Sequence, residues 1–252
     1  MTAKKPDPFF LGWSKKLPKG MKRFVPALAV VLVCLFGGAG FLVGATQNDP
    51  GDGGWVGKRS LTAVMMANPY PVLFAVESDH YAPGTAILLS GWGKRGVQER
   101  AAPLDGKLVS VTGGGLKRGS LDGLQLWNGE AGLKAASEAS AASLPEAVSL
   151  GRWQLTGEIC DGKCYVGAMR PGRGVAHKAC ANFCVLGGVP PIFVSTGAVE
   201  GEIFFLMAGP DGGPIPEVLL NDSAVLVQID GEIERRGTLM IFKVDPESLE
   251  VL

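Results

Sequence analysis

The longest apolar stretch of the chain is residues 24–45, FVPALAVVLVCLFGGAGFLVGA, which has no charged residue over 22 positions. A helix rises about 1.5 Å per residue, so this stretch is long enough to cross a hydrocarbon layer of roughly 30 Å. The pattern therefore predicts one transmembrane helix over residues 24–45.

Beyond residue 60 the apolar residues come in short runs bounded by Gly, Asp or Pro, which is typical of β-strands. We expect strands at 70–76, 85–92, 108–116, 123–127, 152–159 and 191–196. Residues 131–147 are rich in Ala and Ser instead, and they predict a helix or a linker between two halves. The expected division is a leader (1–23), the transmembrane helix (24–45), a linker (46–60), a first β domain (61–130), a connector (131–150) and a second β domain (151–252).

The two β domains repeat the same order of apolar strands, glycine-rich turns and basic hairpins. In this alignment Gly113 matches Gly231, and Arg118 falls near Arg236, which indicates a tandem duplication. Residues 104–126, LDGKLVSVTGGGLKRGSLDGLQL, resemble the strand–turn–strand core of OB-fold proteins, in which a curved antiparallel sheet closes into a small barrel. The resemblance implies a mainly β protein with two OB-like antiparallel β-barrels.

Charges around the apolar run predict its orientation. Asp7 is the only acidic residue before it, whereas seven basic residues lie there: Lys4, Lys5, Lys15, Lys16, Lys19, Lys22 and Arg23. The positive-inside rule therefore places the leader in the cytoplasm and residues 46–252 in the periplasm, with the helix as a single-pass anchor in a bacterial inner membrane. A cleaved signal peptide is the alternative, because Val43-Gly44-Ala45 has the small-residue spacing that signal peptidase accepts.

The formal net charge is zero and few aromatic residues lie among the basic ones. Nucleic acid is therefore not expected as a partner, although many OB folds bind it. Neither a Ser-His-Asp order nor a close pair of carboxylates stands out, so no catalytic residue is assigned and a non-enzymatic role is favoured.

Residues 157–191 hold four of the five cysteines and one of the two histidines. The segment 175–188, VAHKACANFCVLGG, predicts a short helix that ends at two glycines. On this helix His177, Cys180 and Cys184 form one stripe, since Cys180 lies three residues and Cys184 seven residues after His177. The stripe can face Cys160 and Cys164 at the end of the preceding strand. The insertion 160–188 is thus the candidate site, with Cys160, Cys164, His177, Cys180 and Cys184 as its residues.

Three kinds of chemistry suit these residues. Two structural disulfides linking the Cys160/Cys164 pair to the Cys180/Cys184 pair are typical of an exported protein. A Cys₃His set suits zinc, copper or an iron–sulfur centre, with Met169 as a soft additional ligand, although methionine usually serves in packing. A redox-active dithiol is the third alternative, although no Cys-x-x-Cys is present.

The pattern GEIxDxKCYxGxMxPGxGxxHKxCAxxCxxGGxPPxF, written around residues of this chain, resembles a motif of uncharacterised bacterial membrane-anchored exported proteins. Some members of that family are linked to respiratory or oxidoreductase systems. The resemblance implies a shared role for Cys164, His177, Cys180 and Cys184. We therefore expect an accessory or assembly subunit of a membrane redox complex, with other membrane or periplasmic redox proteins as partners. The alternative is a redox protein in its own right that transfers electrons or copper.

Overall fold

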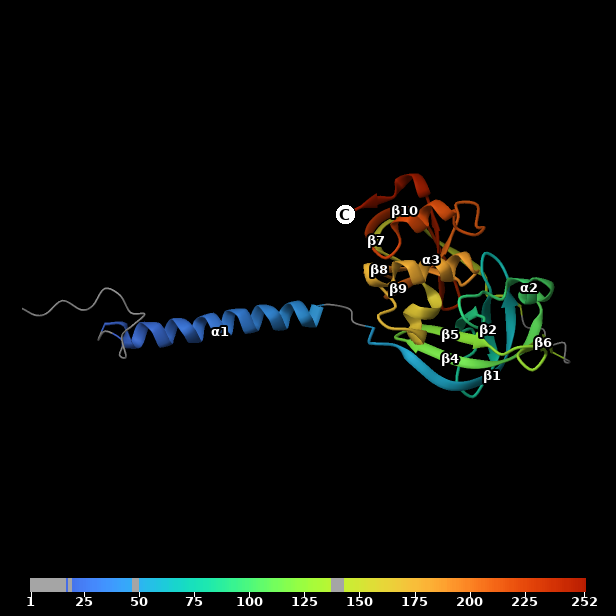
Figure 1. The fold of residues 1–252 in the computed structure, drawn as a ribbon, viewed down its shortest axis with the longest axis horizontal. Coiled ribbons are helices and arrows are strands. Elements are labelled where there is room, and N and C mark those ends of the chain that lie inside the picture. The colour runs from blue at the N-terminus through green and yellow to red at the C-terminus, as the bar shows by residue number, and fades with distance from the viewer. Residues whose placement is uncertain (1–16, 18–19, 47–49, 137–142) are drawn as a thin grey trace, which may run out of the picture. The chain divides into compact units, whose positions relative to one another are not determined.

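The computed structural model describes residue 17 and residues 20–46, 50–136 and 143–252 (Figure 1). The chain divides into two units, residues 1–49 and 50–252, which we describe separately. In the first unit, most of the predicted leader lies outside the described residues, and helix α1 spans Met21–Thr46. Residues 21–45 of α1 are long and apolar enough to cross a membrane, a property that signal sequences share. An N-terminal apolar helix is thus confirmed.

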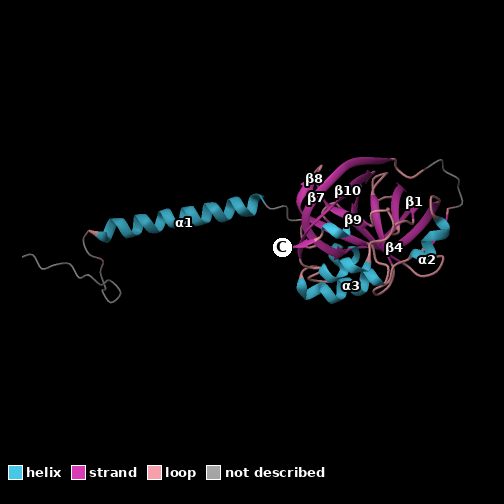
Figure 2. Cartoon of the chain, turned by 90° about the horizontal axis from the view of Figure 1, so that it is seen from above, coloured by secondary structure: helices cyan, strands magenta, loops and turns pink. Residues whose placement is uncertain are grey.

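The second unit is mainly β and contains two six-stranded sheets (Figure 2). The strands of the first sheet are β1 (Gly54–Met66), β2 (Val72–Glu77), β3 (Ala86–Ser90), β4 (Leu108–Arg118), β5 (Leu121–Leu126) and β6 (Leu133–Ala135). They pair in the order β1-β2-β3-β5-β4-β6, and β1 also pairs with β4. A short helix, α2 (Gln98–Ala101), and a 3₁₀ turn, η1 (Ala102–Leu104), lie between β3 and β4.

The second sheet contains a closed five-stranded barrel. Its strands are β7 (Ala147–Asp161), β8 (Pro191–Val199), β9 (Glu202–Ala208), β10 (Leu226–Arg236), β11 (Leu239–Val244) and β12 (Glu250–Val251). The pairing order β11-β9-β8-β7-β10 is closed by the additional pairing of β10 with β11, and β12 extends it at β10. The 3₁₀ turns η4 (Glu217–Asp222) and η5 (Pro246–Ser248) lie in its connections.

The predicted sequence repeat reappears as a repeat of strand register. Gly113 in β4 pairs with Leu126 in β5, and Gly231 in β10 pairs with Val244 in β11. The hairpins close alike, since Arg118 pairs with Leu121 and Arg236 pairs with Leu239. Both sheets also contain one parallel pairing at the same place in the order, β3 with β5 and β9 with β11.

Two expected boundaries differ from the structure. Strand β1 begins at Gly54, inside the predicted linker 46–60, because its exposed polar first half still pairs with β4 from Gly54 onward. The predicted connector 131–150 contains β6 and the start of β7, and its residues 137–142 lie outside the described residues. The ends of the connector are thus strands that pair with β4 and β10, and no helix forms in the part that the structure describes.

A core shared by both sheets joins the two halves of residues 50–252. One buried cluster combines Val72 and Phe74 of the first sheet with Ile192, Phe204 and other side chains of the second. Each sheet also has a core of its own. Since apolar burial is the main stabilising contribution to folding, the two halves stabilise each other.

Candidate metal centre

The Cys/His-rich insertion connects β7 to β8, as the sequence predicts. It contains a π-helical turn, η2 (Cys164–Ala168), a 3₁₀ turn, η3 (Val175–His177), and the helix α3 (Lys178–Leu186). Helix α3 ends where predicted, because Gly187 donates its N–H back to Phe183 and Gly188 takes a φ of +89°, which glycine adopts without strain. Helix α3 lies on one side of the strands (Figure 2).

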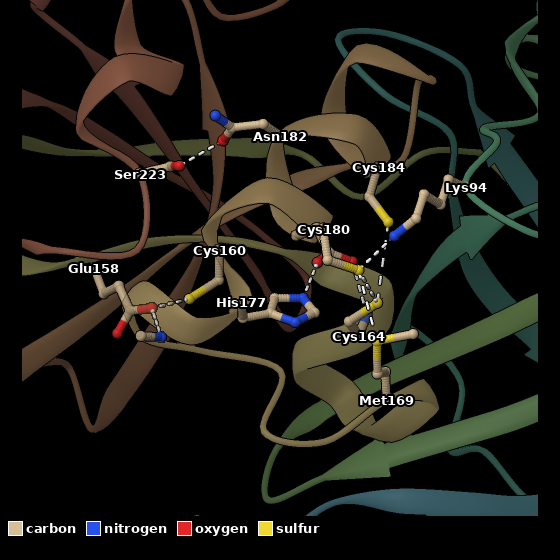
Figure 3. A network of polar contacts seen from close by, with 12 residues as sticks. Lys94, Glu158, Cys160, Cys164, Met169, His177, Cys180, Asn182, Cys184 and Ser223 are labelled. Atoms are coloured by element: carbon tan, nitrogen blue, oxygen red, sulfur yellow. Dashed lines mark hydrogen bonds and ion pairs between the residues drawn. The ribbon is translucent and has the colours of Figure 1, made fainter.

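Three thiols meet at the centre of the insertion (Figure 3). The Sγ atom of Cys164 is 4.0 Å from that of Cys180 and 4.0 Å from that of Cys184. All three sulfurs lie within 4.8 Å of one another. The centre of a triangle with sides of about 4 Å is about 2.3 Å from each corner, which is the usual zinc–sulfur bond length in proteins. The spacing therefore suits one soft metal ion held by three sulfurs.

His177 belongs to a second group that shares Cys164 with the first. Its Nε2 atom is 3.0 Å from Oδ2 of Asp161, and both side chains are buried. The other carboxylate oxygen of Asp161 accepts the backbone N–H of Cys164 at 2.7 Å. Asp161, Cys164 and His177 form a second possible ligand group. Of the predicted Cys₃His set, His177 is thus grouped with Cys164 and Asp161, whereas Cys180 and Cys184 are grouped with Cys164 alone.

Sequence reasoning missed Asp161. It is the last residue of β7 and its side chain is buried, although aspartate is rarely buried without a partner. A carboxylate between two cysteines at the end of an apolar strand is the signal that could have revealed it. Its two oxygens fix both the backbone of Cys164 and the ring of His177.

Cys160 lies apart from the three-thiol cluster. Its side chain is buried and its Sγ donates to Oε1 of Glu158 at 3.3 Å, an oxygen that also accepts the N–H of Gly174 at 2.6 Å. Burial raises the pKa of the Cys160 thiol well above its ordinary value, and the neighbouring Glu158 raises it further. Cys160 is therefore a neutral buried thiol in this structure.

The structure contains no disulfide among the five cysteines, all of which lie in the described residues. A disulfide bond needs sulfurs about 2.05 Å apart, far closer than the 4.0 Å found for Cys164 and its two neighbours. Cys160, which two staples would require as a partner, is hydrogen-bonded to Glu158 instead. The expected pair of disulfide staples is thus not formed, whereas the spacing of the other three thiols leaves room for an ion.

A loop of the first sheet reaches the thiols. The Nζ atom of Lys94 is 2.5 Å from Sγ of Cys180. The ammonium group of Lys163, only 6% exposed, donates to the carbonyl oxygens of Gly91 at 2.6 Å and Gly93 at 2.8 Å. Nothing in the local pattern of residues 90–96 relates this loop to cysteines in the other half of the chain.

The end of α3 holds the same loop by backbone contact. Gly96 donates its N–H to the carbonyl oxygen of Gly187 at 2.7 Å. A side chain would not fit here, because a Cβ on Gly187 would lie 1.9 Å from the carbonyl oxygen of Lys94. The two glycines allow the close approach that brings Lys94 to Cys180.

The neighbouring thiols and lysines shift one another's pKa values. The contact between Cys164 and Cys184, together with burial, raises the pKa of Cys164, whereas that same contact lowers the pKa of Cys184. The pKa values of these two neighbouring thiols are thus shifted in opposite directions. The hydrogen bond to Cys180 raises the pKa of Lys94, which stays a cation beside the sulfurs. Burial lowers the pKa of Lys163, against the opposing effect of Cys164 and Cys184.

Comparisons of the chain with family models, curated proteins and solved structures found no match. The function is therefore argued from the geometry of the site and from the sequence.

Proposed function

We propose that this chain is a membrane-anchored, exported accessory or assembly subunit of a membrane redox complex, and that Cys164, Cys180 and Cys184 hold a soft metal ion for that complex. The observation that carries the proposal is the convergence of the three sulfurs within 4.8 Å. Thiolates are the ligands that zinc, copper(I) and iron–sulfur centres prefer. The apolar helix α1 behind a basic leader supports anchoring and export.

The scaffold in this proposal is a pair of OB-like barrels. The order β1-β2-β3-β5-β4 of the first sheet and the order β7-β8-β9-β11-β10 of the second are equivalent. The ends of both orders also pair, β1 with β4 and β7 with β10. The insertion that carries the thiols occupies the first connection of the second barrel. In such small barrels, ligands bind at the loops between strands, which is where this insertion lies.

Metal content of cysteine variants tests the site. We expect the purified full-length chain, solubilised in detergent and reconstituted under reducing conditions, to retain about one metal ion per chain, as for a single three-thiolate centre. Cys164→Ser, Cys180→Ser and Cys184→Ser are each expected to weaken binding by roughly tenfold or more, since each removes a ligand. Cys34→Ser in α1 is the matched control. A wild-type chain that binds no metal, or ligand variants that bind as well as the control, would overturn the metal site.

Purification from native membranes tests the role in a complex. We expect redox enzyme subunits to co-purify with the mildly solubilised wild-type chain. When residues 162–190 are replaced by a short turn, we expect these subunits either to be absent from the purified material or to lack their cofactor. Recovery of the chain alone, with full redox activity in cells that lack it, would contradict the accessory role.

A further inference from the structure

The arrangement of sulfur around the three thiols carries a further inference about which metal binds. The Sδ atom of Met169 lies 3.6 Å from Sγ of Cys180 (Figure 3). Met169 follows the turn η2, which begins at Cys164, so the same short turn supplies both sulfurs. A fourth sulfur thus stands next to the three-thiol cluster.

The structure gives this fourth position to sulfur and not to nitrogen. His177, the expected fourth ligand, has its Nε2 hydrogen-bonded to Asp161 and is not grouped with Cys180 and Cys184. Structural zinc sites are almost always tetrahedral and use Cys, His or carboxylate ligands. Thioether ligands instead select soft monovalent copper.

Exposure changes stepwise across the four sulfurs. Met169 is 46% exposed, Cys180 is half-buried, and Cys164 and Cys184 are 5% and 1% exposed. An ion that arrives from solvent or from a partner therefore meets Met169 first, then Cys180, and last the two buried thiols. A closed structural site has no such exposed entrance.

Charge also suits copper(I). One monovalent ion held by three thiolates carries two negative charges, which need nearby cations in a partly buried site. Lys94 is in direct contact with Cys180, and Lys163, which directly precedes Cys164 in the chain, has a buried ammonium group. The two lysines thus provide compensation for both charges.

Resting on the function proposed above, we infer that the ion is copper(I), held by Cys164, Cys180 and Cys184, and that Met169 is the exposed ligand through which it enters and leaves. The Met169 thioether first exchanges places with a sulfur of the donor or acceptor, and the three thiolates follow one after another, so that each copper–sulfur bond that breaks is replaced by a bond to the other protein. No electron is transferred in this exchange. The partner is accordingly a copper(I) carrier or a copper-dependent redox enzyme.

The test is an anaerobic titration of the solubilised full-length chain with copper(I) against a chromophoric copper(I) chelator, and with zinc(II) against a zinc chelator. We expect Met169→Leu to weaken copper(I) binding or slow its exchange by roughly tenfold, the size of effect seen when a metal site loses a contributing residue. Zinc binding is expected to stay unchanged in this variant. Met207→Leu, which removes a buried methionine from the barrel core, is the matched control.

X-ray absorption of the copper-loaded chain gives a second measurement. We expect sulfur ligands only, and an unchanged spectrum in His177→Ala. The inference would be overturned if the spectrum showed a nitrogen ligand that disappears in His177→Ala. It would also be overturned if the Met169→Leu variant bound and exchanged copper(I) like wild type. Either result would leave the three-thiol site intact. A wild-type chain that binds neither metal would instead remove the proposed function itself.

Discussion

At the scale of single residues, Lys163 links the two halves of residues 50–252. Its ammonium group is buried, and its partners Gly91 and Gly93 belong to a loop about seventy positions earlier in the chain. A buried lysine is costly unless it is hydrogen-bonded, because burial disfavours its charge. The carbonyl oxygens of Gly91 and Gly93 accept hydrogen bonds from this ammonium group and so fix the loop. The same loop contains Lys94, which contacts Cys180.

We predict that Lys163→Met destabilises the protein by about 2 kcal/mol, since hydrogen bonds to a charged group contribute about 1.5–3 kcal/mol. The methionine keeps the apolar stem but leaves the carbonyl oxygens of Gly91 and Gly93 without the ammonium. Denaturant unfolding of the variant measures the change, and Lys134→Met at an exposed lysine is the control. Equal midpoints for the two variants would show that Lys163 does not hold the loop.

Glu234 makes stability depend on pH. Its carboxylate accepts from Arg236 and from Lys243, and these two cations outweigh the effect of burial, so the pKa of Glu234 is below its ordinary value of 4.5. Because the pKa of Glu234 is lower in the folded state than in the unfolded state, its ion pairs stabilise the fold. This stabilisation is fully present when the pH is above the unfolded-state pKa, and it is lost as the pH falls through the folded-state pKa.

We therefore predict that Glu234→Gln lowers the free energy of unfolding by about 1 kcal/mol at neutral pH, and that wild type and variant converge as the pH falls below the ordinary carboxyl value of 4.5 and through the lowered folded-state value. Denaturant unfolding across that range measures the difference. Glu232→Gln, at an exposed position on the same strand, is the control. A difference that stays constant down to acid pH would contradict the ion-pair explanation.

At the scale of elements, the register of the two long hairpins depends on one glycine each. A Cβ on Gly113 would lie 2.4 Å from the carbonyl oxygen of Gln125, and a Cβ on Gly231 would lie 2.4 Å from that of Lys243. The same steric constraint at equivalent positions of β4 and β10 supports the duplication inferred from the sequence.

We predict that Gly113→Ala and Gly231→Ala each destabilise the protein by about 1–3 kcal/mol, because the obstacle is backbone of the paired strand and the hairpin must shift. Gly197→Ala in β8 is the control, since a Cβ there has no neighbour within 4 Å. Thermal unfolding of the three variants measures the effect. Destabilisation in only one hairpin would show that the two glycines are not equivalent.

Elements with strong local patterns were predictable, and those stabilised by distant pairing were not. The strands expected at 108–116 and 152–159 lie within β4 and β7, and the helix expected in 175–188 is present as α3. The first half of β1, with Lys58 and Arg59, was not predictable because it is largely exposed and has no apolar run. It is a strand because β4 supplies hydrogen-bonding partners along most of its length.

At the scale of the whole molecule, the contrast between local patterns and distant contacts also explains which parts of the candidate site could be predicted. The cysteines and the histidine are close in sequence, and a helical stripe suffices to bring Cys180 and Cys184 together. Lys94 comes from the other half of the chain, and it reaches Cys180 only because Gly96 and Gly187 let two backbones approach. Such contacts arise from packing, which leaves no local sequence pattern.

The last prediction concerns the export of residues 50–252. If α1 anchors the chain as proposed, alkaline phosphatase fused after Leu252 should be active and a fused fluorescent protein that folds only in the cytoplasm should be dark. Reversing the leader charges, with Lys15, Lys16 and Lys19 changed to Glu, should reduce phosphatase activity because basic residues retain the leader inside. The mass of the mature chain separates an anchor from a signal peptide, since cleavage after Ala45 would remove α1. An active cytoplasmic reporter would place the thiols in a reducing compartment and contradict the exported role.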